Sequence, residues 1–315
     1  MKNYGLLKYK NTEVNSFTSN NGMLLRKLIN PLLRRLLKLA VENEVIIDNY
    51  PRLKRKQPYI FVSLHGFVED TIANLSTIDR NAYLLFGTTN QLEINNEMYF
   101  AWLNGFIYVN REDQKSRSDA LLKMERVLNN GNSVLIFAEG GFNNTENLLC
   151  LRLFASPYYL AKSTKVKVVP IAPFKEYGTK TIYMNIGKPI DLSRFDDKSI
   201  ALKHLRNRLA TLMYQNIERH SSRLQRSKLA NDPRMAFMEE RKKEYQKTKW
   251  TRDVWDEELT RYLDADDREY NAVQESMDNI VITKDNAKIM APILIRRAEN
   301  QKYDFKKYMH ENWDK

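Results

Sequence analysis

Cysteine is almost absent from this chain of 315 residues, which contains Cys150 and no other. A single cysteine cannot form an intramolecular disulfide, and this fits a protein of the reducing cytoplasm. A lone cysteine can also be a nucleophile, but the leucines at 148, 149 and 151 favour a small buried apolar side chain. The four histidines are far apart and no His/Cys group has the spacing of metal ligands, so we predict no metal site.

The chain also lacks long apolar runs. No uninterrupted apolar stretch reaches about 18 residues, the length that spans a bilayer as a helix. The N-terminus has neither the apolar core nor the small-residue cleavage site of a signal peptide. A G-x-S-x-G nucleophile elbow is missing as well, which disfavours a covalent serine intermediate. We therefore expect a cytoplasmic protein without a transmembrane helix.

Positive charge is concentrated in the N-terminal fifth of the chain. The formal net charge is +12, and residues 1–60 contain 12 Lys/Arg against 4 Asp/Glu, whereas residues 221–315 contain 20 against 19. Such an excess attracts phosphates, whether in nucleic acid, anionic lipid, coenzyme A or an acidic carrier protein. Because no nucleic-acid-binding motif is present and the basic residues share a leucine-rich segment, we expect no nucleic-acid partner.

Residues 23–40 predict a basic amphipathic helix. Leucines recur there every three or four residues, Lys27, Arg34 and Lys38 lie on the other side, and Pro31 marks a kink or the first turn. Such a helix can bind an anionic membrane surface, which here means peripheral association with the inner face of the membrane. It can equally pack on the domain with its charges in solvent, and the pattern does not choose between these two interpretations.

Apolar runs typical of strands alternate with helical segments between residues 59 and 190. Strands are predicted at 59–65, 82–89, 105–111, 133–141, 165–174 and 181–190, and helices at 66–79, 96–104, 116–129 and 151–163. This alternation predicts an α/β fold with a mostly parallel or mixed sheet flanked by helices. We place an N-terminal segment with the amphipathic helix at 1–48, the α/β domain at 49–199 and a C-terminal helical extension at 200–315.

His65 and Asp70 are the first candidates for chemistry. His65 ends a predicted strand, and Asp70 follows five residues later, about one turn into the next helix. A carboxylate there can bind one imidazole nitrogen and fix the tautomer, while the other nitrogen takes a proton from a hydroxyl. A structural histidine fits the same spacing and Glu69 is a rival partner, so the pattern alone leaves both readings open.

Two further blocks also end predicted strands, where α/β sheets gather their ligands. Arg111 suits recognition of a phosphate or carboxylate, or else a surface salt bridge. Glu139, Gly140 and Gly141 break an apolar strand. The glycines permit positive φ and expose N–H groups that could hold an oxyanion or phosphate, although an ordinary turn has the same residues.

A fourth block, Val169-Pro-Ile-Ala-Pro173, places Pro170 inside a predicted strand. Proline cannot donate to a sheet ladder, so the pattern predicts an edge strand or a bulge. By itself this block says nothing about function.

The four blocks, in this order, resemble the motifs of the glycerolipid acyltransferase family, the lysophosphatidate acyltransferase or PlsC-like group. The first family motif, H-x-x-x-x-D, is matched by His65 and Asp70, and the second ends in a strand-borne arginine, matched by Arg111. The third reads F-P-E-G-T-R and the fourth begins V-P, and these are matched in part by Phe137, Glu139, Gly140, Val169 and Pro170.

This resemblance implies an enzyme that moves a fatty acyl chain onto a hydroxyl of a lysophospholipid-like or other lipid or metabolite acceptor. It implies acyl-CoA or acyl-carrier protein as donor and co-substrate, and no other cofactor. It further implies that His65 is the general base with Asp70 in support, that Arg111 binds the acceptor phosphate, and that the acceptor pocket is shaped by Glu139, Gly140, Gly141 and Pro170.

The third block departs from the family pattern. Ala138, Gly141 and Phe142 stand where the family has proline, threonine and arginine. A charged hydrogen bond contributes roughly 1.5–3 kcal/mol, so losing that arginine would weaken a glycerol-phosphate acceptor about 10- to 100-fold. Either another basic residue substitutes or the acceptor is not lysophosphatidate. A non-catalytic protein that binds acyl lipid or carrier protein through a degenerate site is the alternative.

Overall fold

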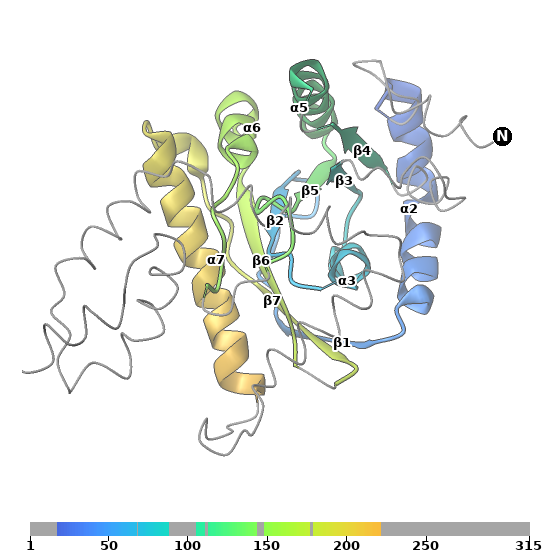
Figure 1. Cartoon of the computed structure of the whole chain (residues 1–315). Helices are drawn as coiled ribbons and strands as arrows, with labels where there is room; N and C mark the ends of the chain where they lie inside the picture. Colours follow the sequence, from blue (N-terminus) through green and yellow to red (C-terminus); the bar gives the residue numbers. More distant parts are fainter. Residues whose placement is uncertain are drawn as a thin grey trace, which may run out of the picture. The chain divides into compact units, whose positions relative to one another are not determined.

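The protein is represented by a computed structural model that describes residues 18–67, 69–87, 105–110, 113–143, 148–176 and 179–221. These residues all belong to one compact unit, Met1–Leu259. They form a seven-stranded mixed sheet with helices on both faces, as Figure 1 shows. The predicted α/β fold class is therefore confirmed.

The strands follow one another in space in the order β1-β7-β6-β2-β5-β3-β4. Five neighbouring strands, from β6 to β4, run parallel, so their carboxyl ends share one edge of the sheet. β7 is antiparallel to β6, and β1 is parallel to β7. Their bounds are β1 Glu44–Asn49, β2 Ile60–Ser63, β3 Ala82–Gly87, β4 Phe106–Val109, β5 Ser133–Ile136, β6 Val168–Lys175 and β7 Thr181–Ile186.

Helices bury the sheet from both sides. One face packs against α3 (Asp70–Thr77), and the other packs against α5 (Gln114–Asn129), α6 (Ser156–Thr164) and α7 (Lys198–His220). The helix α2 (Asn20–Ala40) contacts α3 and contributes Met23 to one core and Leu37 to the other. A short 3-10 turn, η2, lies at Leu192–Arg194. On β2, Ile60 and Val62 join one core and Phe61 the other, so every residue is buried. This explains why β2 reads as an unbroken apolar run.

Two described elements lie at the expected limits of the α/β domain, and the limits themselves stay a prediction. β1, which was not predicted, joins the sheet as a largely exposed edge strand and begins at Glu44, before the expected limit of the domain. α7 begins at Lys198 and packs on β6 and β7, so its residues also belong with the sheet. The helix predicted at 151–163 begins only at Ser156, and the one predicted at 96–104 lies outside the described residues.

Pro170 lies inside the sheet, so the expectation of an edge strand is wrong. β6 pairs with β2 on one side and β7 on the other. Ile171 of β6 pairs with Ile186 of β7, and Val168 pairs with Ile190 after β7. The segment after β7 therefore has one residue more than β6 between these two pairs. Pro170 still accepts a hydrogen bond from the Gly187 N–H, 2.8 Å away. The missing N–H of the proline therefore lies at a bulge, which was the alternative to an edge strand in the sequence analysis.

Arg26 attaches α2 to the sheet. Its side chain is buried and donates to the Ala82 carbonyl oxygen at 2.8 Å and to the Asn81 side chain, and its guanidinium lies 4.2 Å from the centre of the Tyr83 ring. Gly105, with a φ of +73°, passes so close that an added Cβ would lie 2.4 Å from the Arg26 Nε. A glycine is therefore required there both by conformation and by space.

We predict that Gly105→Ala destabilises the protein by about 2 kcal/mol more than Gly131→Ala, because overpacking a buried contact typically costs 1–3 kcal/mol. Gly131 is a matched control: its φ is +75°, but no atom lies within 4 Å of an added Cβ. Urea unfolding of both variants measures the difference. Equal losses would show that Arg26 moves aside without cost.

Candidate active site

His65 lies at the carboxyl edge of the sheet, two residues after β2 ends at Ser63. The last ladder bond runs from the Leu64 N–H to the Ile171 carbonyl of β6, at 3.0 Å. The His65 side chain beyond it is 16% exposed. The imidazole is thus placed by a fully buried strand but still reaches the surface of the domain.

Asp70 is in contact with the His65 side chain, as the spacing predicted. The imidazole Nδ1 lies 2.9 Å from Asp70 Oδ1 and 3.0 Å from Oδ2. Asp70 is completely buried, and its Oδ2 also accepts the backbone N–H groups of Gly66, at 2.7 Å, and Phe67, at 3.1 Å. Because the loop folds around this carboxylate, an Nδ1–H on His65 completes the network and leaves Nε2 as the acceptor nitrogen.

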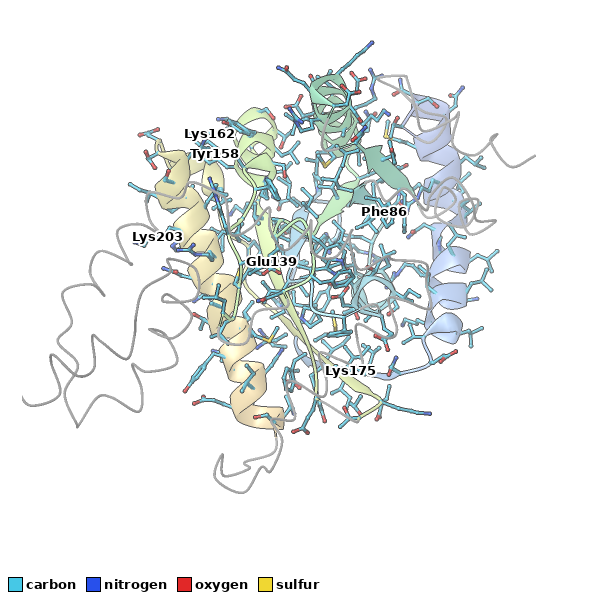
Figure 2. The ribbon with its side chains drawn as sticks, viewed as in Figure 1. Phe86, Glu139, Tyr158, Lys162, Lys175 and Lys203 are labelled. Atoms are coloured by element: carbon cyan, nitrogen blue, oxygen red, sulfur yellow. The ribbon has the colours of Figure 1, made fainter. Side chains whose placement is uncertain are left out.

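Glu69, the rival partner, turns away from His65. It accepts a hydrogen bond from Lys175 at 2.7 Å, and Lys175, labelled in Figure 2, is the last residue of β6. Burial by itself would raise the pKa of Glu69, but the hydrogen bonds from Lys175, Asn43 and the backbone and the charge of Lys175 together lower the pKa. Asp70 is therefore the carboxylate that contacts the imidazole, and Glu69 binds Lys175 of β6 instead.

Asn74 braces the His65–Asp70 pair from behind and was not identified in the sequence. Its Nδ2 donates to the Ser63 Oγ at 3.0 Å and to the Asp70 carbonyl at 2.8 Å. It thereby links the end of β2 to the first turn of α3. The only signal in the sequence is its place, one turn after Asp70, which any surface asparagine could share.

Glu139 holds the main chain of His65. The turn after β5 carries it into the interior, where Oε2 accepts the His65 N–H at 2.9 Å and Oε1 accepts the Leu151 N–H at 2.6 Å. Figure 2 shows Glu139 among the packed side chains of the domain. Burial raises its pKa to about 7, although both amide hydrogen bonds lower it. With both oxygens occupied, the carboxylate supports the loop that carries His65, and contact with an acceptor stays a prediction.

The two glycines complete the turn beside His65. Gly140 has a φ of +75°, and its N–H donates to the Phe137 carbonyl at 3.0 Å. Gly141 is partly exposed, and the chain then returns to the site, where the Asn143 N–H donates to the His65 carbonyl at 2.7 Å. Both main-chain groups of His65 are thus held by this turn, one through Glu139 and one through Asn143.

Two phenylalanine rings lie against the His65 imidazole. The Phe137 centroid is 4.2 Å from the imidazole centroid with the planes at 27°, and the Phe142 centroid is 3.7 Å away at 30°. Phe142 occupies the family's arginine position, so the contact replaces a charge with a stacked ring. Nothing in the sequence showed that these residues face His65, because ring orientation depends on the turn between them.

One other expected site residue, Arg111, and the lone cysteine are considered next. Arg111 lies outside the described residues; β4 ends two residues before it, at the same edge as His65. Cys150 is buried next to Glu139, and burial raises the pKa of its thiol well above the ordinary value, so it is not an activated nucleophile. Within the described ranges, no cluster of His, Cys, Asp or Glu side chains is arranged to hold a metal ion.

Glu139 should make stability pH-dependent. Its pKa is about 7 in the folded protein against an ordinary value of 4.5, so the folded state binds the proton more tightly. The stabilisation is fully present below pH 4.5 and is lost as the pH rises through 7, by up to about 3 kcal/mol at 1.36 kcal/mol per pKa unit. We expect Glu139→Gln to flatten this fall in urea unfolding, whereas Glu44→Gln, an exposed control, should not. An unchanged slope in Glu139→Gln would contradict the assignment.

Comparisons with known proteins agree with this arrangement. Residues 44–173, which include all four blocks, match the family model Acyltransferase. A search of curated protein sequences found no match. The crystal structure of the 1-acyl-sn-glycerophosphate (LPA) acyltransferase PlsC from Thermotoga maritima has a similar fold, with a TM-score of 0.52 and 16% identity over 66% of this chain and 87% of that one. Residues 44–173 are therefore similar to the acyltransferase family, and the chain has a PlsC-like fold.

Proposed function

We propose that this domain transfers a fatty acyl chain from acyl-CoA or acyl-carrier protein to a hydroxyl of a lysophospholipid-like or other lipid or metabolite acceptor. The contact between His65 and Asp70 at the carboxyl edge of the sheet is the observation that carries the proposal. The match of residues 44–173 to the acyltransferase family model supports the reaction type. The similar protein PlsC acts, by its name, on 1-acyl-sn-glycerophosphate.

His65 acts as the general base in this proposal. Its Nδ1–H donates to Asp70, so the Nε2 lone pair takes the proton of the acceptor hydroxyl as the oxygen attacks the thioester carbonyl. Asp70 stabilises the imidazolium that forms. The tetrahedral intermediate then expels the thiolate of the carrier, which receives the proton from His65. The products are an ester and a free thiol, and the base returns to its starting state.

Gly141 is our candidate for holding the oxyanion of that intermediate. The N–H groups of His65, Gly66 and Phe67 already donate to carboxylates and are not available. Among the residues that the structure describes, none accepts a hydrogen bond from the Gly141 N–H, which lies in the turn beside the imidazole. Backbone donors of this kind stabilise an oxyanion without having to reorganise.

The acceptor site is proposed to be less positively charged than that of lysophosphatidate enzymes. Phe142 offers no charge, and Lys175 at the same edge of the sheet is already paired with Glu69. We propose that Arg111 supplies the phosphate contact if the acceptor carries a phosphate. Because Phe142 replaces the arginine of the family motif, we expect this site to favour acceptors without a phosphate more than a site with that arginine does.

We predict that His65→Ala lowers acyl transfer by about 10²- to 10⁴-fold, the usual contribution of a general base. Asp70→Asn should lower it by about 100-fold or more, because an amide donor at Nδ1 selects the wrong tautomer. The assay supplies labelled acyl-CoA or acyl-carrier protein together with extracted lipids. His220→Ala is the matched control. His220 is the last residue of α7 and contacts Asp48, away from His65, so this variant should keep full activity.

Equal transfer by the wild type and by His65→Ala would refute the role of His65. Tight binding of the acyl donor without turnover on any acceptor would instead support the non-catalytic binding protein. The departures at Gly141 and Phe142 are the observation that keeps this second candidate in view.

We further propose that α2 docks on an anionic membrane surface. No described helix is long and apolar enough to cross a membrane. The inner face of α2 packs on the domain through Met23, Leu33 and Leu37, yet the opposite face leaves a second row of leucines exposed, up to 83% at Leu39. This row, the leucine stripe, is Leu25, Leu28, Leu32, Leu36 and Leu39, and exposed Lys27, Arg35 and Lys38 flank it. An apolar stripe beside basic residues suits the boundary between acyl chains and anionic headgroups.

Replacing two leucines of the stripe, Leu28→Glu with Leu32→Glu, should weaken binding to phosphatidylglycerol vesicles at least about 100-fold, because each buried leucine contributes 1.5–3 kcal/mol. Leu122→Glu, which changes an exposed leucine on α5, is the control and should bind as the wild type does. Co-sedimentation measures the binding. Wild-type binding that is absent, or unaffected by the double change, would exclude the stripe as the contact.

A further inference from the structure

The His65 imidazole is enclosed between two phenyl rings. Phe137 and Phe142 both stack nearly parallel to it, with centroids 4.2 Å and 3.7 Å from its centre. Two rings stacked at these distances on the same face would overlap each other, because a phenyl ring is wider than the sideways offset that such distances allow. The rings must therefore lie on opposite faces of the imidazole, one on each side.

This enclosure leaves one way to approach the imidazole. Both faces are covered by rings, and the Nδ1 edge is occupied by Asp70. The remaining edge carries Nε2 and its two neighbouring carbons. The exposed 16% of the His65 side chain must therefore come chiefly from this edge. A hydroxyl that reaches His65 is directed to Nε2 in the plane of the ring, the direction in which its lone pair accepts a proton.

We propose that Phe142 is a positioning residue for the general base. The proposal rests on the proposed function. Phe142 enters the site from the end of the Glu139–Gly141 turn, and its neighbour Asn143 is fixed to the His65 carbonyl at 2.7 Å. The ring therefore moves with the main chain of His65. It limits rotation of the imidazole and so holds Nε2 toward the acceptor.

The two rings also favour the charged state that forms during the reaction. The face of a phenyl ring carries negative charge density, which attracts a cation within about 6 Å of its centre. Both centroids are within that range of the imidazole. The attraction grows when His65 takes the proton, so it stabilises the transition state more than the resting state. Phe142 thus lacks the charge with which the arginine of the family motif could bind an acceptor phosphate, and it positions the base instead.

Three substitutions in the full chain test this role. Phe142→Leu removes the flat ring, Phe142→Tyr keeps it, and Phe174→Leu is a control at another partly buried phenylalanine, one that stacks on Tyr183. The readouts are kcat and KM with labelled acyl-CoA, thermal unfolding, and the ring-proton NMR shifts of ¹³C-labelled histidine. His65→Gln identifies the His65 signals. His220, stacked on Tyr183 at 3.6 Å, is an internal reference that should not move in the Phe142 variants.

We expect Phe142→Leu to shift the His65 ring protons downfield, because one ring current is lost, and to lower kcat about 10-fold with an unchanged acceptor KM. Phe142→Tyr and Phe174→Leu should retain both the His65 shifts and kcat. If Phe142→Leu unfolds, Phe142→Met, which also lacks a ring, takes its place.

Unmoved His65 signals, an unchanged kcat, or a loss confined to KM would overturn the role of Phe142. A wild type that transfers no acyl group would refute the proposed function and with it any catalytic role. In that case the NMR shifts still decide whether the rings enclose His65, so the two failures are distinguishable.

Discussion

Backbone amides hold two buried carboxylates on either side of His65, and the arrangement of the site depends on this interaction. Burying a carboxylate is costly unless hydrogen bonds replace water. Asp70 is satisfied by the N–H groups of Gly66 and Phe67 together with the imidazole, and Glu139 by those of His65 and Leu151. Asp70 therefore fixes the side chain of His65 while Glu139 fixes its main chain, and neither can move without exposing an unpaired charge.

The sheet makes this double support possible. β2 lies between β6 and β5 and runs parallel to both, so His65 after β2 and the turn after β5 leave the same edge side by side. Because all residues of these two strands are buried, the edge is rigid up to its last ladder bond. The Glu139–Gly141 turn and Phe142 then enclose the imidazole from the side of β5. Pro170 does not take part in this support: it lies within the sheet, at the bulge between β6 and the segment after β7.

α2 shows how one short sequence can serve two environments. Its inner face contains the buried Arg26 that contacts β3 and Tyr83, and its outer face contains the leucine stripe. A helix that only packed on the domain would need just one apolar face. The two interpretations of this segment are therefore compatible: the helix packs intramolecularly, and the row of leucines that packing leaves exposed supports the proposed contact with a membrane.

Sequence alone determined those features that depend on neighbouring residues. A carboxylate close to His65 follows from a strand, a turn and a helix in one continuous segment, although the structure chose Asp70 over Glu69, and the buried strands follow from apolar runs. Only the tertiary structure decided which distant groups meet: Glu139 with the backbone of His65, Asn74 with Ser63, and Phe142 with the imidazole. It also decided that β1 joins the sheet and that β6 is internal, because the short apolar run of β1 does not reveal its pairing with β7 and a bulge can accommodate a proline. Such contacts depend on how the segments pack, and spacing along the chain does not contain that information.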